Sequence, residues 1–306
     1  MFLLRTAVIG IGSNSLRMLL ADIQEEKLYR VKRYREGLRT FAALDADGNI
    51  EDGMIQKACD KVGEFVREAK SQGAEALHLF ATSAVRDARN QETFAASLEA
   101  ATGLRLEVCS GELEARLSFI GATEHKPSGL IDIGGGSTEI ACGEGGKVEQ
   151  AISLQMGAVR LFRLMPIRDK ASAYEVVEAS RQKLLPVCKA FLSASLEEWV
   201  GVGGTFTTVA ALAQQIPWND RERIHHYPLT VEKVEAVLRQ LAPLTLEERL
   251  KLPSLQPQRA DIVVHGVAIL LACMQSLSIP VIHVSECGNL EGYLKWKYIP
   301  FFHGQN

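Results

Sequence analysis

The sequence predicts an α/β protein of two similar lobes, each opening with three β-strands and continuing in the order βββαβα around a mixed sheet. The first observation behind this prediction is an internal repeat, because residues 9–17 and 131–139 match position by position around a glycine-rich centre. The second observation is that both centres lie between apolar runs, which is the pattern of two strands joined by a tight turn. The third observation is length, since 306 residues are enough for two domains.

The first lobe is expected to contain three consecutive strands and then alternating helices and strands. Its first long helix is indicated by apolar residues at helical spacing, namely Ile55, Ala58, Cys59, Val62, Phe65 and Val66. The expected strands lie at 5–10, 16–22, 28–34, 76–81 and 104–109, and the expected helices at 53–71, 91–102 and 111–122. Residues 1–118 are assigned to this lobe.

The second lobe is expected to repeat the three-stranded opening and then to become richer in helix. Its expected strands lie at 128–133, 137–142, 148–154, 198–202 and 281–284, and its expected helices at 157–165, 172–193, 205–214, 231–241, 259–277 and 289–296. Residues 119–306 are assigned to this lobe. The C-terminal helix, about 289–306, is a candidate to pack back onto the first lobe.

Composition narrows the class of protein. A net charge of −3 excludes a generally basic chain, so no nucleic-acid partner is predicted and any polyanion must be bound locally. No apolar run approaches the about 20 residues of a membrane helix, so no membrane partner is predicted. The opening residues run directly into the first strand, and we therefore expect no signal peptide and a cytoplasmic location. Six scattered cysteines without close histidines argue against a zinc site.

Three glycine-rich turns are the candidate phosphate-binding sites. Successive N–H groups in such turns form anion-binding concavities, and glycine allows close approach of a ligand. The third turn precedes a helix, whose N-terminus also suits phosphate. The alternative for the first two turns is a pair of ordinary β-hairpins. The candidate phosphate-binding residues are Gly12, Ser13, Asn14, Ser15, Gly134, Gly135, Gly136, Ser137, Gly203, Gly204 and Thr205.

Two lobes that each begin with a strand, a glycine turn and a strand resemble the superfamily of actin, sugar kinases and heat-shock-chaperone ATPases. Four segments resemble one family within it more closely, the Ppx/GppA family of exopolyphosphatases and guanosine pentaphosphate phosphohydrolases. These segments are 11–15 (IGSNS), 81–90 (ATSAVRDARN), 110–117 (SGELEARL) and 132–139 (DIGGGSTE). The resemblance implies two actin-like (ribonuclease H-like) lobes with the active site in the cleft between them.

The same resemblance implies a Mg²⁺-dependent hydrolase that releases terminal phosphate from inorganic polyphosphate or pppGpp. The implied partners are polyphosphate or guanosine penta- or tetraphosphate, and a homodimer is a candidate assembly. Phosphoryl transfer relies on positioning and charge neutralisation, so amide cradles, a cation and a base are the parts that it needs. A regulator that binds guanosine nucleotides with little turnover is the main alternative. A sugar or acetate kinase on the same fold is a weaker one.

The resemblance also implies roles for individual residues. Glu114 would be the general base on the attacking water, with Glu112 as the alternative base. Arg86 would neutralise charge on the transferred phosphoryl group. Asp132 and Glu139 would hold Mg²⁺ through oxygen ligands. Spacing alone would favour an ordinary surface glutamate at position 114, and Glu139 could form a cross-strand ion pair.

Three positions depart from the family pattern. Gly10 stands where the family has Asp in its first phosphate loop, and the internal repeat places it opposite Asp132. Near the C-terminus, Glu286 replaces Asp and Leu290 replaces Arg. A carboxylate that would help to hold the cation is therefore missing from the first loop, which is the observation behind the alternative of a low-activity regulator.

Overall fold

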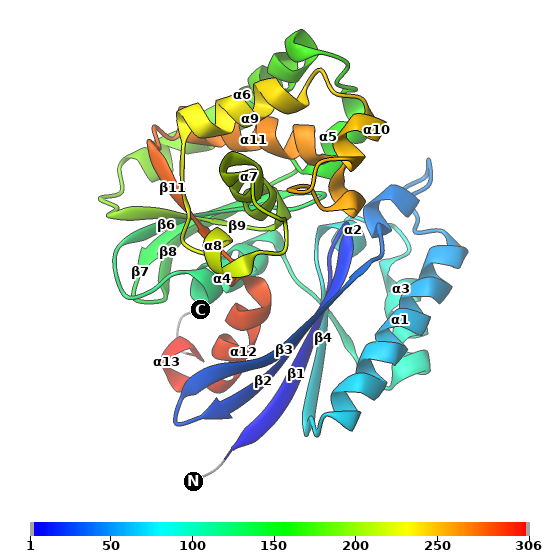
Figure 1. The fold of residues 1–306 in the computed structure, drawn as a ribbon. Coiled ribbons are helices and arrows are strands. Elements are labelled where there is room, and N and C mark those ends of the chain that lie inside the picture. The colour runs from blue at the N-terminus through cyan, green and yellow to red at the C-terminus, as the bar shows by residue number, and fades with distance from the viewer. Residues whose placement is uncertain (1–2, 304–306) are drawn as a thin grey trace. The chain divides into compact units, whose positions relative to one another are not determined.

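The computed structural model describes residues 3–303, which form two compact units (Figure 1). Unit 1 is the chain up to Gly121 together with the chain from Asn289 onward, and unit 2 is Ala122–Gly288. Each unit contains one sheet whose first three strands are joined in sequence by antiparallel pairing. The predicted α/β class with a repeated three-stranded opening is therefore confirmed.

The sheet of unit 1 has the strand order β3-β2-β1-β4-β5. Strands β4 and β5 lie parallel to β1, so β1, β4 and β5 end at the same edge of the sheet. The strands are β1 (Leu4–Ile11), β2 (Ser15–Gln24), β3 (Lys27–Gly37), β4 (Ala76–Ala81) and β5 (Leu106–Val108).

Helices cover both faces of this sheet, because its strands bury alternate residues on each side. On one face, α1 and α3 pack on a cluster that includes Ile9, Met18 and Phe94. On the other face, α12 packs on a cluster that includes Phe80 and Leu290 (Figure 1). The helices are η1 (Thr40–Ala43), α1 (Asp52–Ser71), α2 (Ser83–Arg86), α3 (Gln91–Thr102), α4 (Gly111–Ala122), α12 (Asn289–Tyr298) and α13 (Pro300–His303).

Unit 2 repeats the plan with the strand order β10-β11-β9-β6-β7-β8. Strands β9 and β11 run parallel to β6, so these three also end at one edge. The strands are β6 (Ser128–Ile133), β7 (Thr138–Glu144), β8 (Lys147–Leu154), β9 (Glu198–Val202), β10 (Pro228–Thr230) and β11 (Val281–Ser285). The helices are α5 (Ala158–Leu164), α6 (Lys170–Leu192), α7 (Gly204–Gln214), α8 (Arg221–Ile224), α9 (Val231–Leu241), α10 (Leu246–Leu250), η2 (Pro257–Arg259) and α11 (Val263–Ser276).

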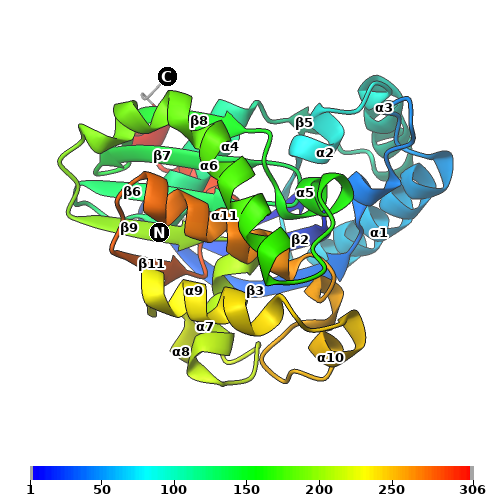
Figure 2. The same cartoon turned by 90° about the horizontal axis from the view of Figure 1, so that it is seen from above.

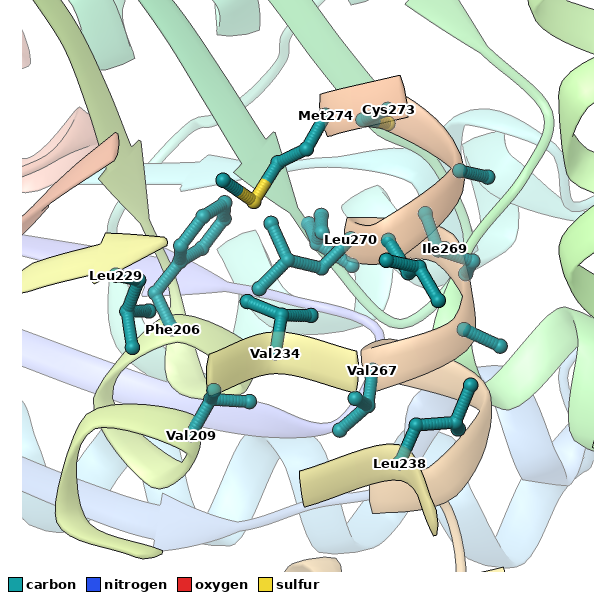
Figure 3. Close-up of a cluster of buried hydrophobic side chains, with 14 of the residues drawn as sticks. Phe206, Val209, Leu229, Val234, Leu238, Val267, Ile269, Leu270, Cys273 and Met274 are labelled. Atoms are coloured by element: carbon teal, nitrogen blue, oxygen red, sulfur yellow. The ribbon is translucent and has the colours of Figure 1, made fainter. Parts of the chain in front are cut away.

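Helix α11 is the centre of the unit 2 core. It is apolar around its whole circumference, and twelve of its residues are buried, which is the pattern of a helix enclosed by other elements. It lies between α6 and α9 on one face of the sheet (Figure 2). Figure 3 shows Leu270 and Met274 of α11 beside Phe206 of α7 and Val234 of α9. This packing holds the N-terminus of α7 in place at the end of β9.

The structure adds short elements that the sequence did not predict and shortens some that it did. The unpredicted elements are η1, α2, α8, β10, α10, η2 and α13. The helix predicted over 259–277 begins only at Val263, after η2. The helix predicted over about 289–306 ends at Tyr298, since Pro300 cannot continue its hydrogen bonding, and residues 304–306 lie outside the described chain. Among residues 3–303, no helix is long and apolar enough to cross a membrane.

His265 is expected to make unit 2 sensitive to acid. Its imidazole is buried in α11, its Nε2 lies 2.8 Å from the Met165 carbonyl oxygen, and burial lowers its pKa below the usual value. The unfolded chain therefore binds this proton more readily than the folded chain does. The neutral imidazole of His265 therefore leaves the free energy of unfolding undiminished above pH ~6.5. As the pH falls below that value, the free energy of unfolding decreases by up to about 1.4 kcal/mol per pH unit.

Urea unfolding at pH ~7.5 and ~5.5 measures this effect in the wild type and in His265→Gln, whose amide can still donate to the Met165 oxygen. The free energy of unfolding of the variant is expected to depend less steeply on pH. An equal pH dependence in the two proteins would show that His265 is not the group responsible.

Candidate active site

The first glycine turn joins β1 to β2 and is closed by a hydrogen bond from the Gly12 amide to the Ser15 carbonyl oxygen, 3.0 Å long. Its carbonyl groups are held by the segment that leads into η1. The Phe41 amide donates to the Ser13 oxygen at 2.9 Å, and two preceding amides donate to the Asn14 oxygen at 3.1 and 3.2 Å. These bonds fix which way the peptide groups of the turn face.

The second glycine turn joins β6 to β7 and has the same construction. The Gly134 amide donates to the Ser137 oxygen at 3.0 Å. The first amides of α5 hold the carbonyl groups, since Val159 and Arg160 donate to the Gly135 oxygen at 2.8 and 3.0 Å. The side chain of Arg160 donates from Nε to the carbonyl of the next glycine at 2.7 Å.

The two turns are therefore suited to bind anions in the same way. The N–H and C=O groups of a trans peptide point in opposite directions, so anchoring the carbonyls on one side turns the following amides to the other. The amides of Asn14 and Ser15 face away from η1, and those of Gly136 and Ser137 face away from α5. Consecutive amides that point outward from a turn form an anion-binding nest.

The third glycine turn lies beside the second turn within unit 2. Gly203 has a φ of 100°, and a Cβ there would lie 3.0 Å from Asp132 Oδ1, so both the backbone angle and the close approach require glycine. A Cβ at Gly204 would lie 1.8 Å from Arg259 Cζ, which places this guanidinium across the N-terminus of α7. A guanidinium and a helix N-terminus at one place both favour a bound anion.

Thr205, the last residue of the third turn, has a different environment from the two glycines. Its side chain is buried against α11, where a Cβ at Gly266 would lie 2.5 Å from Thr205 Oγ1. The structure thus brings Gly203 and Gly204 to the second turn, while the Thr205 side chain packs into the helical layer.

Asp132 and Glu139 are directly opposed on the antiparallel strands β6 and β7, so their side chains share one face of the sheet. Both are buried, and Ser153 Oγ on β8 donates to Glu139 Oε1 at 2.7 Å. Within residues 3–303 no three His, Cys, Asp or Glu side chains group into a metal site. Two carboxylates nevertheless fit Mg²⁺, which commonly takes one or two of them together with waters and substrate phosphates.

Glu114 is in the first turn of α4 and is 7% exposed. Its Oε2 accepts a hydrogen bond from Arg86 Nη1 at 2.9 Å, and the same Nη1 donates to the Cys109 carbonyl oxygen at 3.0 Å. The Ser110 hydroxyl accepts from the Leu113 amide and so caps the helix. A helix N-terminus and an adjacent guanidinium both stabilise negative charge, and a charged carboxylate is the form that acts as a base.

Glu112, the alternative base, has a different environment. Its side chain is 61% exposed and pairs with Arg116 one turn later on the helix, with 2.9 Å between Arg116 Nη2 and Glu112 Oε1. Burial and partners therefore distinguish the two glutamates, and they favour Glu114.

Helix α2 links the first turn to this pair. Ser83 at the start of α2 lies with its Oγ 2.7 Å from Ser13 Oγ, and Arg86 ends the same helix. The first turn follows β1, α2 follows β4 and α4 follows β5, so all three stand at the carboxyl ends of parallel strands. In open α/β sheets, ligands bind at this edge. Unit 2 repeats the arrangement, with its second turn after β6 and its third after β9.

Sequence reasoning missed three residues that build these turns: Gly157, Arg160 and Arg259. A Cβ at Gly157 would lie 2.4 Å from the carbonyl carbon of Gly135, so only glycine lets α5 approach the second turn this closely. The sequence signal for Gly157 was a glycine at the very start of the helix predicted over 157–165. No pattern in the sequence near Arg259 signals its role, because only the fold brings this residue next to Gly204.

Comparison with known proteins places the chain among phosphatases. It matches the model of the Ppx/GppA phosphatase family over residues 19–297. Exopolyphosphatase 2 of Mycobacterium tuberculosis is 31% identical to it, with 95% of this chain and 98% of the relative covered. Exopolyphosphatase 1 of Mycobacterium leprae is 29% identical, with 95% and 88% covered.

Solved structures give the same result. The crystal structure of the Aquifex aeolicus member of the Ppx/GppA family superposes with a TM-score of 0.83 at 27% identity, covering 97% of this chain and 98% of that one. An exopolyphosphatase-like protein superposes with a TM-score of 0.89 at 26% identity, covering 98% and 99%. The predicted actin-like fold class is thereby confirmed.

Proposed function

Since the chain belongs to the Ppx/GppA phosphatase family, we propose that it is a Mg²⁺-dependent hydrolase that removes the terminal phosphate from inorganic polyphosphate or from pppGpp. The family resemblance and the enzyme class expected from the sequence are both confirmed by the match and by the related exopolyphosphatases. The single observation that carries the mechanism is the ion pair between the buried Glu114 and the half-buried Arg86 beside the first turn.

Glu114 acts as the general base in this proposal. A water oxygen attacks the terminal phosphorus while a Glu114 oxygen takes a proton from that water. The new bond joins phosphorus to the water oxygen, and the bond to the bridging oxygen breaks. The bridging oxygen keeps the electron pair and leaves with the shortened chain. Arg86 holds Glu114 Oε2 in place, which orients the carboxylate for this transfer.

The glycine turns and arginines hold the phosphates. Outward-facing amides of the first and second turns bind non-bridging oxygens, and in unit 2 the α7 N-terminus with Arg259 offers a further anion site. Arg86 also lowers the cost of charge that builds on the transferred group. Within each unit, backbone hydrogen bonds hold the amides of the turn in place before substrate arrives.

Asp132 and Glu139 are the residues that would hold Mg²⁺. When bound, the cation neutralises phosphate oxygens and lowers the barrier to charge development. The support for this assignment is their opposition across β6 and β7, their burial, and their hard oxygen donors.

Removing the metal is the first experimental test. With polyphosphate of defined length or pppGpp as substrate, we expect release of inorganic phosphate that requires Mg²⁺, stops with excess EDTA and returns when Mg²⁺ is restored. Comparison of the two substrates identifies the preferred one.

Two outcomes would contradict the proposal. No phosphate release from either substrate at saturating Mg²⁺, with binding of guanosine nucleotide retained, would favour the regulator. Transfer that requires ADP as acceptor, with ATP as product, would favour a kinase.

A further inference from the structure

The two copies of the internal repeat differ in charge at the row of residues next to each glycine turn. In unit 2, strand pairing sets Asp132 opposite Glu139 and opposite Val202. In unit 1 the same pairing gives a row that runs across the sheet through Arg35, Arg17, Gly10, Phe80 and Glu107. Gly10 therefore takes the place of Asp132, and Arg17 takes the place of Glu139. The acidic pair of the second turn has no counterpart at the first.

Apolar side chains occupy the space beside Gly10. A Cβ at this position would lie 3.0 Å from Leu290 Cδ2 and 3.0 Å from Phe80 Cζ, closer than ordinary contacts. Leu290 is 6% exposed and Phe80 1%, and both belong to the apolar cluster under α12. The Phe80 ring stacks on Tyr293 with 5.2 Å between centroids. A carboxylate at position 10 would enter an apolar environment, which is costly without a partner.

Contacts with α4 and with the sheet hold helix α12 in its place beside Gly10. A Cβ at Gly292 would lie 1.7 Å from the Leu117 carbonyl oxygen, so α12 already touches the backbone of α4. Two polar contacts fix its first turn on the sheet. Arg17 Nη2 donates to Asn289 Oδ1 at 3.0 Å, and Arg33 forms an ion pair with Glu291. The position of Leu290 over Gly10 is therefore set by the backbone around it.

The charged residues that pair with Gly10 on the β2 side of the row are positive. Arg17 lies directly opposite on β2, and Arg35 is the next residue across on β3. A guanidinium keeps its charge at any pH at which the protein is folded. A divalent cation beside Gly10 would meet these guanidinium groups on the β2 side and the Phe80 and Leu290 side chains on the other. Glu107, at the far end of the row, accepts a hydrogen bond from the Tyr293 hydroxyl at 2.8 Å.

We propose that the first glycine turn binds phosphate without a cation, because Gly10 offers no ligand and Leu290 fills the space that a carboxylate at that position would need. This inference rests on the proposed function and adds to it that cation binding belongs to the Asp132 row alone. The two repeats have become electrostatically unlike, because the opposed pair Asp132 and Glu139 at the second turn is replaced by Gly10 and Arg17 at the first.

Measuring Mn²⁺ binding to the full chain by calorimetry or electron paramagnetic resonance tests, without any turnover, whether cation binding is confined to the Asp132 row. One Mn²⁺ per chain is expected in the wild type. Asp132→Asn should weaken that binding at least about tenfold, and Leu290→Ala should leave it unchanged. Two equivalents in the wild type, none at all, or an unchanged affinity in Asp132→Asn would overturn the inference. Absence of phosphate release with this binding pattern intact would instead count against the proposed function.

A double-mutant cycle measured by thermal unfolding tests whether Leu290 fills the space beside Gly10. Gly10→Ala should lower the unfolding midpoint in the wild type and lower it less in a Leu290→Ala background, because truncation at 290 vacates the space that the new methyl group needs. Equal shifts in the two backgrounds would show that Leu290 does not close the space at Gly10. Both variants add or remove only apolar atoms, so folding is expected to survive.

Discussion

Glu114→Gln is expected to lower kcat for phosphate release by about 10²- to 10⁴-fold, the usual contribution of a general base. Glutamine keeps the size of the side chain and still accepts the hydrogen bond from Arg86 Nη1, but it cannot take a proton from water. Substrate binding should be retained, since the variant leaves the glycine turns untouched. Single-turnover phosphate release and a separate binding measurement distinguish the two effects.

Glu112→Gln is the matched control, because it makes the same change two residues away on the same helix. Glu112 is exposed and paired with Arg116, so its replacement should leave kcat within about twofold of the wild type, as expected for a surface charge. If Glu112→Gln loses the activity and Glu114→Gln keeps it, the general base is Glu112 and the assignment of Glu114 is wrong.

Asp132→Asn is expected to produce the second large effect. The substitution removes one of two opposed carboxylates and keeps the shape of the side chain, so the Mg²⁺ concentration needed for half-maximal rate should rise. At saturating Mg²⁺ we expect kcat to stay about 10²- to 10³-fold lower, comparable to the loss of one preorganised electrostatic partner of the transition state. The measurement is initial rate against Mg²⁺ concentration.

The control for this variant is Glu144→Gln at the exposed end of β7, which changes the charge of unit 2 equally. It should leave the Mg²⁺ dependence as in the wild type. A normal Mg²⁺ dependence in Asp132→Asn would remove Asp132 from the cation site.

The long elements and the glycine turns could be predicted because their signals are local. Helical spacing marked α1 from Ile55 to Val66, and the structure begins that helix within one residue of the prediction. The repeated turns share one hydrogen bond, from Gly12 to Ser15 and from Gly134 to Ser137. Short elements such as α8 and β10 were missed, since three or four residues do not complete a recognisable period.

The remaining features could not be predicted from the sequence because they depend on contacts between distant segments. The approach of Arg259 to Gly204 depends on the packing of α11 and η2, and no pattern near either residue signals it. In the same way, Gly10 and Leu290 each look like isolated departures along the sequence, yet the structure joins them in a single contact. The residues proposed to be catalytic, Glu114 and Arg86, lie in clear sequence motifs, whereas contacts such as that between Gly10 and Leu290 are set by tertiary packing.

The source of the oxygen in the released phosphate tests the central claim most directly. In a single turnover in water enriched in ¹⁸O, attack by an activated water on the terminal phosphorus predicts one labelled oxygen in the released phosphate and none in the shortened chain. Label in the shortened chain, or phosphate released without label, would contradict water attack on the terminal phosphorus and the role assigned to Glu114.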